Sequence, residues 1–193
     1  MHTGLFFGSF NPIHQGHLIL ARTILNTTEL KEIWFVVSPH NPLKEKSTLL
    51  NQYDRLHMVE LALKGQEDIR SSSIEFGLPQ PSYTIQTLSY LEEKHPKQKF
   101  ALIMGEDNLA GLHKWRHYDQ ILERYPILVY PRRGGETEAF AGHPNVIRLD
   151  QAPVVEISST MIRKFIKADQ PIDFLVPDAV KACLLKEGYY RYA

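Results

Sequence analysis

Short apolar runs of strand length alternate along this chain with longer segments whose apolar residues recur every three or four positions. The runs predict buried strands at 3–7, 33–37, 100–104, 127–130 and 146–149. The longer segments predict helices with one apolar face at about 16–25, 83–95, 159–167 and 177–186, and a further helix after Asn51 that carries Leu56, Val59 and Leu63 on one face. Strands and helices that alternate in this way form parallel strands joined by right-handed crossovers. We therefore predict an α/β fold with a doubly wound parallel sheet.

Local signals indicate where some of these helices begin and end. Asn51 is a predicted N-cap, and Gly188 is a predicted C-terminal cap of the last helix. On the first helix, Leu18, Ala21 and Leu25 lie on one stripe, which we expect to face a core.

The chain shows no linker that would separate two domains. Its loosest stretch is 132–144, which contains three glycines and mixed charge and is expected to form a loop. A length of 193 residues favours one domain. We therefore expect a single domain over 1–193, with the C-terminal helices at about 157–193 packed on it.

Charge and cysteine content exclude several classes of protein. The chain has 22 basic and 22 acidic residues, whereas a general nucleic-acid binder carries a surplus of Lys and Arg. Any phosphate binding must therefore be local. The single cysteine, Cys183, forms no internal disulfide, and the apolar runs are too short to cross a bilayer. The first residues also lack the features of a signal peptide, so we expect a cytoplasmic protein without nucleic-acid or membrane partners.

Residues 8–17 read Gly-Ser-Phe-Asn-Pro-Ile-His-Gln-Gly-His and lie between the first predicted strand and its helix. In open α/β sheets, ligands bind beyond the carboxyl ends of the strands. The segment is neither a P-loop nor a dinucleotide fingerprint. It places His14 and His17 on one face of a helix start, where free N–H groups attract phosphate. The alternatives are capping histidines and metal ligands, but no further ligands stand at a suitable spacing. In this setting we favour phosphate binding.

A second group of polar residues occurs at 157–163, which reads Ile-Ser-Ser-Thr-Met-Ile-Arg. Its three hydroxyl residues precede an amphipathic helix, so they can cap the helix or donate to an anion placed there. Arg163 returns to the same face one turn after Ser159, and an arginine fork suits phosphate oxygens. Taken alone, this pattern is typical of an ordinary N-cap with a solvated arginine.

Together, the two segments resemble the signature motifs of the nucleotidylyltransferase superfamily, a His-x-Gly-His turn and an Ile-Ser-Ser-Thr-x-x-Arg helix start. Further matches cover essentially the whole chain and narrow the resemblance to the bacterial nicotinate mononucleotide adenylyltransferases. These matches are Pro42-Leu43-Lys44, Pro81-Ser82-Tyr83-Thr84, Gly105-Glu106-Asp107-Asn108 leading to Trp115, Arg132, and the tail over 175–191. The chain departs from the family pattern at three positions. Asn11 stands where an Asp is usual, Leu78 stands near an expected arginine, and Arg116 follows Trp115 where an aromatic residue is often found.

The resemblance implies a Rossmann-like nucleotidylyltransferase fold and an activity. Such enzymes transfer the adenylyl group of ATP to nicotinate mononucleotide, which gives nicotinate adenine dinucleotide and pyrophosphate in NAD biosynthesis. ATP and nicotinate mononucleotide are thus the expected partners. Mg²⁺ is expected to accompany ATP through its phosphate oxygens, with no metal site in the protein itself.

The resemblance also implies a role for each motif residue. His14, His17 and Arg163 are expected to be catalytic and to act on the ATP phosphates. The residues expected to bind ATP are Gly8, Ser9, Phe10, Gly16, Gly105, Asp107, Ile157, Ser159 and Thr160. The residues expected to bind the mononucleotide are Lys44, Tyr83, Thr84, Trp115 and Arg132, with Lys44 and Arg132 at its phosphate or at the departing pyrophosphate.

Three other functions compete with this interpretation. In the first two, the chain is an adenylyltransferase whose acceptor is nicotinamide mononucleotide or phosphopantetheine. In the third, it is a nucleotide-sensing module that has lost turnover. Class I aminoacyl-tRNA synthetases share the histidine turn, but this chain lacks the length for an anticodon domain. The sequence leaves open whether the chain forms a homo-oligomer.

Overall fold

The computed structural model describes residues 2–39 and 49–191, and a parallel sheet runs through its centre. The six strands are β1 (His2–Gly8), β2 (Glu32–Val37), β3 (Ile69–Ser72), β4 (Lys99–Gly105), β5 (Ile127–Tyr130) and β6 (Val146–Arg148). Their order across the sheet is β3-β2-β1-β4-β5-β6, and every neighbouring pair is parallel. Because the order reverses between β1 and β4, the predicted doubly wound sheet is confirmed.

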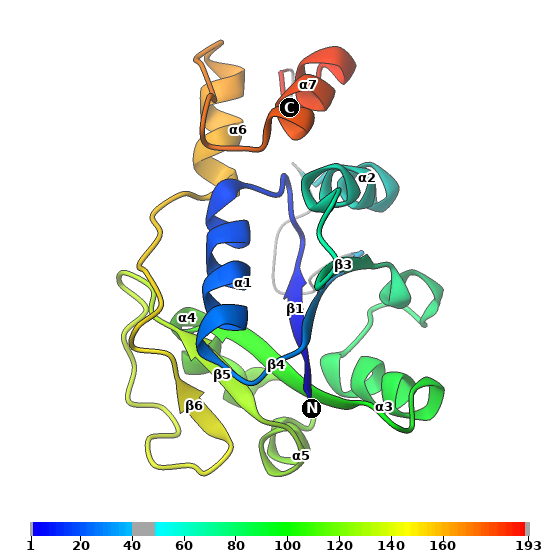
Figure 1. Cartoon of the computed structure of the whole chain (residues 1–193), viewed down its shortest axis with the longest axis vertical. Helices are drawn as coiled ribbons and strands as arrows, with labels where there is room; N and C mark the ends of the chain where they lie inside the picture. The colour runs from blue at the N-terminus through cyan, green and yellow to red at the C-terminus, as the bar shows by residue number, and fades with distance from the viewer. Residues whose placement is uncertain (1, 40–48, 192–193) are drawn as a thin grey trace.

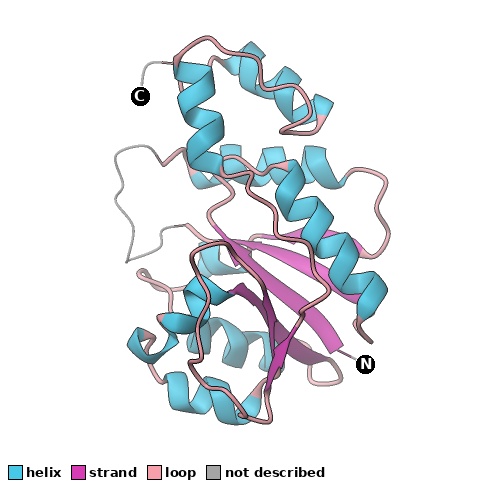
Figure 2. Ribbon diagram, turned by 90° about the vertical axis from the view of Figure 1, so that its left-hand side faces the viewer, coloured by secondary structure: helices cyan, strands magenta, loops and turns pink. Residues whose placement is uncertain are grey.

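Helices cover both faces of the sheet (Figures 1 and 2). They are α1 (Gln15–Thr27), α2 (Gln52–Leu63), α3 (Thr84–Lys94), α4 (Glu106–Ala110), α5 (Tyr118–Arg124), α6 (Ser159–Lys167) and α7 (Asp178–Glu187), with the 3-10 helices η1 (Ile74–Gly77) and η2 (Leu112–Lys114). On one face α1, α2, α6 and α7 share a hydrophobic core, and α3, α4 and α5 share a second core on the other. In Figure 1, α6 and α7 stand beyond the carboxyl end of β1. None of the described helices is long and apolar enough to span a membrane.

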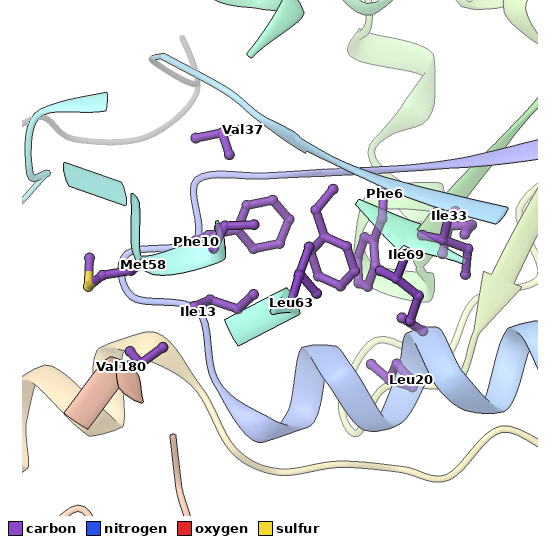
Figure 3. Close-up of a cluster of buried hydrophobic side chains, with 14 of the residues drawn as sticks. Phe6, Phe10, Ile13, Leu20, Ile33, Val37, Met58, Leu63, Ile69 and Val180 are labelled. Atoms are coloured by element: carbon purple, nitrogen blue, oxygen red, sulfur yellow. The ribbon is translucent and has the colours of Figure 1, made fainter. Parts of the chain in front are cut away.

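Strand side chains alternate between the two cores, as a pleated strand requires. In β1, Leu5 enters the core under α3 and α5, whereas Phe6 enters the core under α1 and α2. Figure 3 shows Phe6 and Phe10 in one cluster with Ile13, and Val180 of α7 belongs to the same core. Burying a side chain of this size contributes roughly 1.5–3 kcal/mol. The turn that follows β1 is therefore anchored in the core.

Most predicted elements are confirmed within a few residues, and the differences have physical causes. Asn51 and Gly188 cap α2 and α7 as predicted. The sequence predicts five strands, and the sixth, β3, lies at the sheet edge and buries only Ile69, so it has no apolar run. Helices α4 and α5 are not predicted either, because they are five and seven residues long. Segments of that length show no clear periodicity.

The buried stripe of α1 differs from the predicted one. It is centred on Leu20, Ala21 and Ile24, which are almost fully buried. The predicted residues Leu18 and Leu25 lie at its margins and are partly buried against the same core. Only Ala21 is common to both, because the buried face of α1 is wider than one row of residues.

Candidate active site

Two hollows open side by side at the carboxyl ends of β1 and β4. We call the first the histidine pocket; His14 and His17 line it, and its volume is about 260 Å³. We call the second the aromatic pocket; Tyr83 and Trp115 line it, and its volume is about 380 Å³. Both pockets are lined by Phe6, Phe7, Gly8, Ser9, Asn108 and Tyr130. A ligand can therefore extend from one pocket into the other.

The two histidines of the turn are stacked at the start of α1. His14 is the N-cap, and its main-chain N–H donates to Nδ1 of His17 at 3.2 Å. The ring centroids lie 3.7 Å apart with an angle of 27° between the planes. Nδ1 of His14 is buried and has no hydrogen-bond partner in the described part of the chain. The capping interpretation thus accounts for His17 in part, but it leaves a polar atom of His14 available to a ligand.

Burial also sets the charge of His14. Its side chain is largely removed from water, and this desolvation together with the nearby Arg132 guanidinium lowers its pKa to about 4. The imidazole is therefore neutral at pH 7, and a neutral ring offers one N–H donor and one acceptor nitrogen. A phosphate brought close to it would favour the protonated form and raise that pKa.

The second motif reaches the histidine turn across almost the whole chain. Oγ of Ser159 donates to the carbonyl of Pro12 at 2.8 Å, and Nη1 of Arg163 donates to the carbonyl of Asn11 at 2.8 Å. The cap of α6 is Ser158, whose Oγ accepts from the N–H of Met161. The hydroxyl of Ser159 therefore holds the turn, so any donation by Ser159 to an anion comes from its main-chain N–H at the helix start.

Asn11 connects this turn to two further segments. Its Oδ1 accepts a hydrogen bond from the N–H of Leu50 at 3.2 Å and another from the hydroxyl of Tyr190 at 2.7 Å. Asn11 and Tyr190 are both almost fully buried. The amide oxygen thus serves as an acceptor here without a negative charge, which makes the departure from Asp compatible with the geometry.

Glycine is required at two positions of the turn because of close packing. A β-carbon on Gly16 would lie 3.0 Å from Nδ1 of His14 and 3.0 Å from the Val155 side chain. A β-carbon on Gly8 would lie 2.7 Å from the ring of Phe10. These glycines let the His14 and Phe10 rings fold back onto the backbone.

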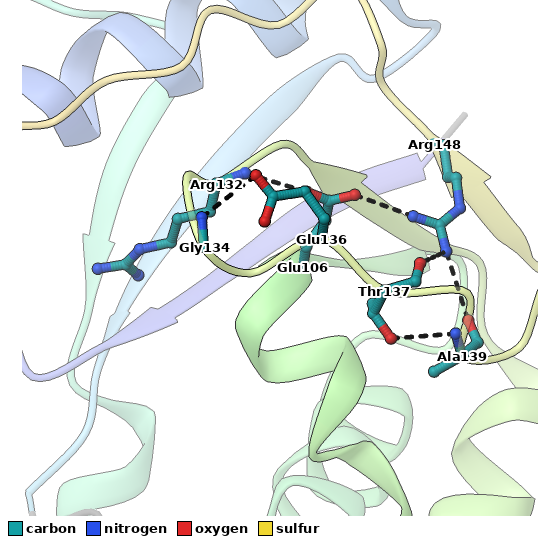
Figure 4. Close-up of polar contacts among 7 residues, drawn as sticks. All are labelled: Glu106, Arg132, Gly134, Glu136, Thr137, Ala139 and Arg148. Carbon is teal, nitrogen blue, oxygen red and sulfur yellow. Dashed lines mark hydrogen bonds and ion pairs between the residues drawn. The ribbon is translucent and has the colours of Figure 1, made fainter.

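A polar network ties the segment after β5 to the start of α4 (Figure 4). Glu106 accepts from the N–H of Arg132 at 3.1 Å and from Nη1 of Arg148 at 3.0 Å. Nη1 of Arg132 also lies 3.2 Å from Oδ2 of Asp107. Arg148 donates in addition to the carbonyl of Thr137, so the predicted loop over 132–144 is attached to β6. Arg132 lines the histidine pocket, beside His14, and not the aromatic pocket.

The structure brings most of the predicted ATP-binding residues together. Those that line the histidine pocket are Gly8, Ser9, Phe10, His14, Gly16, His17, Ile157, Ser159, Thr160 and Arg163. Gly105 and Asp107 line neither pocket as the structure describes them, whereas the next residue, Asn108, lines both. A β-carbon on Gly105 would lie 2.6 Å from Oδ1 of Asp107, so the two are packed against each other. Lys44 lies outside the described residues.

The aromatic pocket lies at the start of α3. Tyr83 is the N-cap of that helix and Thr84 is its first residue, and both line the pocket with Trp115. The guanidinium of Arg116 lies 4.9 Å from the centre of the Tyr83 ring, in a cation–π arrangement. The predicted acceptor residues Tyr83, Thr84 and Trp115 are thus brought together, and Arg116 lines the same pocket.

A buried carboxyl group also lines the aromatic pocket. Glu75 is 3% exposed and accepts from the hydroxyl of Thr87 at 2.8 Å. Burial raises its pKa, and hydrogen bonds from the hydroxyls of Thr87, Ser38 and Ser82 oppose that rise. Sequence reasoning missed Glu75, whose only signal is a position between the apolar residues 74 and 76.

The described residues contain no group of three or more His, Cys, Asp or Glu side chains placed to hold a metal ion. The histidine pocket, within the same ranges, is lined by no carboxylate. A hard cation such as Mg²⁺ prefers oxygen ligands and keeps several waters. Such an ion in this pocket would be held by ligand oxygens and water.

Comparison with known proteins gives one consistent result. The cytidylyltransferase-like family matches residues 5–165. A Flavobacterium johnsoniae protein named “Probable nicotinate-nucleotide adenylyltransferase” is 51% identical over 193 residues, which cover 99% of this chain and 100% of the relative. A Cytophaga hutchinsonii protein of the same name is 47% identical over 190 residues, which cover 98% of each chain.

A solved structure shares the fold. The Plasmodium falciparum nicotinic acid mononucleotide adenylyltransferase, complexed with NaAD, superposes with a TM-score of 0.83 over 100% of this chain and 98% of its own. The two sequences are 18% identical. At that identity the likeness supports the Rossmann-like arrangement of strands and helices.

Proposed function

Because the chain belongs to the cytidylyltransferase-like family and, within it, to the nicotinate-nucleotide adenylyltransferases, we propose that this site transfers the adenylyl group of ATP to nicotinate mononucleotide. The products are nicotinate adenine dinucleotide and pyrophosphate. The observation that carries the proposal is the shared wall of the two pockets at Gly8 and Ser9. A donor in the histidine pocket and an acceptor in the aromatic pocket meet at that wall.

The histidine pocket supplies the chemistry of the transfer. An oxygen of the acceptor phosphate forms a bond to the α-phosphorus of ATP, and the bond from that phosphorus to the oxygen of the departing pyrophosphate breaks. The attacking phosphate is already ionised at neutral pH, so no general base is needed. Catalysis then depends on in-line placement and on donors to the phosphate oxygens. We assign that role to His14, His17 and Arg163, which line the histidine pocket.

The aromatic pocket selects the acceptor. Tyr83 and Trp115 offer flat apolar surfaces for a pyridine ring. Thr84 is the first residue of α3, where main-chain N–H groups have no partner within the helix. Such N–H groups favour an anionic carboxylate over a neutral amide.

Arg132 and Mg²⁺ complete the proposal on the phosphate side. The place of Arg132 beside His14 supports contact with the departing pyrophosphate, the second of its two expected roles. Because the described lining of the histidine pocket has no carboxylate, we propose that Mg²⁺ enters with ATP and is held by phosphate oxygens. The ion would neutralise charge on the departing group. A cytoplasmic location belongs to this proposal and is supported by the single cysteine.

The experiment that tests this function is an assay of pyrophosphate release from ATP with three acceptors offered separately. These are nicotinate mononucleotide, nicotinamide mononucleotide and phosphopantetheine. We expect the highest kcat/KM with nicotinate mononucleotide and equal amounts of dinucleotide and pyrophosphate. Turnover with phosphopantetheine alone would assign a different acceptor, and binding of ATP without turnover would indicate a nucleotide-sensing module.

A further inference from the structure

Arg55, near the start of α2, is the most deeply buried charged side chain that the structure describes. Its exposure is 0%, and it lines neither pocket. None of the ion pairs among the described residues includes it. A buried arginine is costly unless its N–H groups are hydrogen-bonded. The hydrogen-bond partners of Arg55 therefore matter for the structure around it.

The guanidinium of Arg55 binds four main-chain carbonyls from three segments. Nη1 donates to Ser9 at 2.6 Å and to Ser38 at 2.8 Å, and Nη2 donates to Pro39 at 2.8 Å. Nε donates to Leu50 at 2.9 Å. Bonds from a charged donor are stronger than neutral ones. Burial lowers the pKa of Arg55 only to about 10, so the group is a cation at neutral pH.

These bonds begin where the hydrogen bonds of the sheet end. At the ends of β1 and β2, the N–H of Ser38 donates a hydrogen bond to the carbonyl of Gly8 at 2.9 Å. One residue further on, Nη1 of Arg55 joins the carbonyls of Ser9 and Ser38. Ser9 lines both pockets, and Ser38 lines the aromatic pocket. The guanidinium therefore lies behind the wall at which donor and acceptor meet.

The backbone between Ser9 and Phe10 is strained, so it keeps this conformation only if its surroundings hold it. Phe10 has a φ of 45°, a left-handed conformation that a bulky residue rarely adopts and that costs about 1–3 kcal/mol. Packing fixes the Phe10 side chain, which is 2% exposed and whose ring centroid lies 5.1 Å from that of the His17 ring. The carbonyl side is fixed by Arg55. Because this peptide is planar and trans, the N–H of Phe10 points opposite to the Ser9 carbonyl, away from α2.

We propose that Arg55 is a positioning residue for adenylyl transfer, which holds the Ser9–Phe10 peptide of the histidine pocket and Ser38 of the aromatic pocket in one fixed arrangement. It touches neither substrate. Its bonds set the distance between the two strand ends, and with it the in-line placement of donor and acceptor. This inference rests on the proposed function.

The test compares Arg55→Lys with a matched control, Arg22→Lys. Lysine keeps the charge and the alkyl stem but lacks the planar fork that binds several carbonyls at once. Arg22, on α1, makes a similar fork to Asp68, with bonds of 2.6 and 2.9 Å, but it is only partly buried and lines neither pocket. For both variants, kcat and both KM values are measured at a temperature where circular dichroism shows the protein to be folded.

If Arg55 positions the reacting groups, kcat of folded Arg55→Lys falls roughly tenfold or more, while KM for each substrate changes less than about threefold. A residue that only adds global stability would leave the kcat of the folded protein unchanged. The control keeps kcat and both KM values within about twofold. Normal kcat in folded Arg55→Lys, or an effect confined to KM, would overturn the inference.

Two further results keep the test decisive. If Arg55→Lys is unfolded in buffer, the assay is repeated with trimethylamine N-oxide, an osmolyte that favours the compact state. Failure to fold even then would make Arg55 a residue of the fold and would also overturn the inference. The wild-type protein is assayed in parallel; if it forms no dinucleotide, the proposed function fails, and if it does, only the role of Arg55 is being judged.

Discussion

The histidine pocket and the aromatic pocket share a wall but are built in different ways. The histidine pocket joins the turn at 11–17 to the helix start at 158–163 by hydrogen bonds between residues 147 and 152 positions apart. The side chains special to the aromatic pocket come mainly from 75–116, and its one buried carboxyl, Glu75, gathers hydroxyls from around it. On the proposed roles of the two pockets, the difference means that transfer depends on the C-terminal helices, whereas acceptor choice depends on a local segment. Substitutions should separate the two.

The largest separation is expected for His17→Ala. Its ring lies at the start of α1 in the histidine pocket, where we propose that the charge on the phosphates changes during transfer. Loss of one such donor lowers kcat by roughly a hundredfold to a thousandfold, about 3–4 kcal/mol. KM for ATP and for the mononucleotide should change far less. Steady-state kinetics test this, with His57→Ala on the exposed face of α2 as the control. A collapse of ATP affinity with kcat nearly intact would make His17 a ground-state binder.

The two pockets should also respond to acid with opposite signs. The pKa of His14 is about 4 in the fold and 6.5 for an unperturbed histidine. Between those values the unfolded chain takes up a proton that the folded chain does not, so the free energy of unfolding falls as the pH falls from about 6.5 to about 4, by up to about 3 kcal/mol. Glu75 has a raised pKa and acts in the opposite direction. Its contribution to the free energy of unfolding grows as the pH falls through that raised pKa towards 4.5.

Urea unfolding of His14→Gln at several pH values measures the histidine term. The variant cannot gain a proton at position 14, so its stability should fall less between pH 6.5 and pH 4 than that of the wild type. His57→Gln, at an exposed position outside both pockets, is the control for the exchange of histidine for glutamine. Equal pH dependence in His14→Gln and the wild type would show that His14 does not hold a lowered pKa.

Glu75→Gln is expected to act on the aromatic pocket alone. The carboxyl accepts from three hydroxyls, and an amide replaces one acceptor oxygen with a donor. One mismatched buried bond costs about 1–3 kcal/mol, so KM for the mononucleotide should rise roughly tenfold while KM for ATP stays the same. The exposed Glu60→Gln on α2 is the control. A similar rise in both KM values would mean that the pockets are not independent.

The smallest effect is expected for Tyr190→Phe, which removes the hydroxyl that binds Asn11. Asn11 keeps its bond from Leu50, so the turn loses about 1 kcal/mol of support and kcat should fall about fivefold. Tyr189→Phe, at the neighbouring position and outside both pockets, should leave kcat unchanged. Identical kcat values for the two variants would show that the Tyr190 hydroxyl does not support the turn of the histidine pocket.

Much of the fold was predictable because its signals are local. Buried parallel strands appear as apolar runs, and the caps at Asn51 and Gly188 depend on neighbouring residues. The edge strand β3 lacked such a run because most of it stays partly exposed. The sequence marked the histidine and Ile-Ser-Ser-Thr motifs as candidate site segments, and the structure joins them in one pocket. Their binding of phosphate stays a prediction.

The supports of the site were not predictable, because nothing near them in sequence marks their partners. Arg55 stands in an amphipathic helix, where an arginine is ordinarily solvated; its burial depends on carbonyls contributed by residues 9, 38, 39 and 50. Glu75 is buried because residues 38, 82 and 87 bring hydroxyls to it. Ser158, and not Ser159, caps α6, because the Ser159 hydroxyl donates to the carbonyl of Pro12, which is far away in sequence.

The division of labour between the pockets is tested most directly by the ratio of kcat/KM for nicotinate mononucleotide to that for nicotinamide mononucleotide, in the wild type and in His17→Ala. Two charged hydrogen bonds to the nicotinate carboxylate, each worth about 1.5–3 kcal/mol, predict a preference of roughly a hundredfold or more. Since we propose that Tyr83, Thr84 and Trp115 determine acceptor choice, the ratio should be the same in His17→Ala, although both rates fall. A wild-type ratio near one, or a preference lost in His17→Ala, would contradict the account.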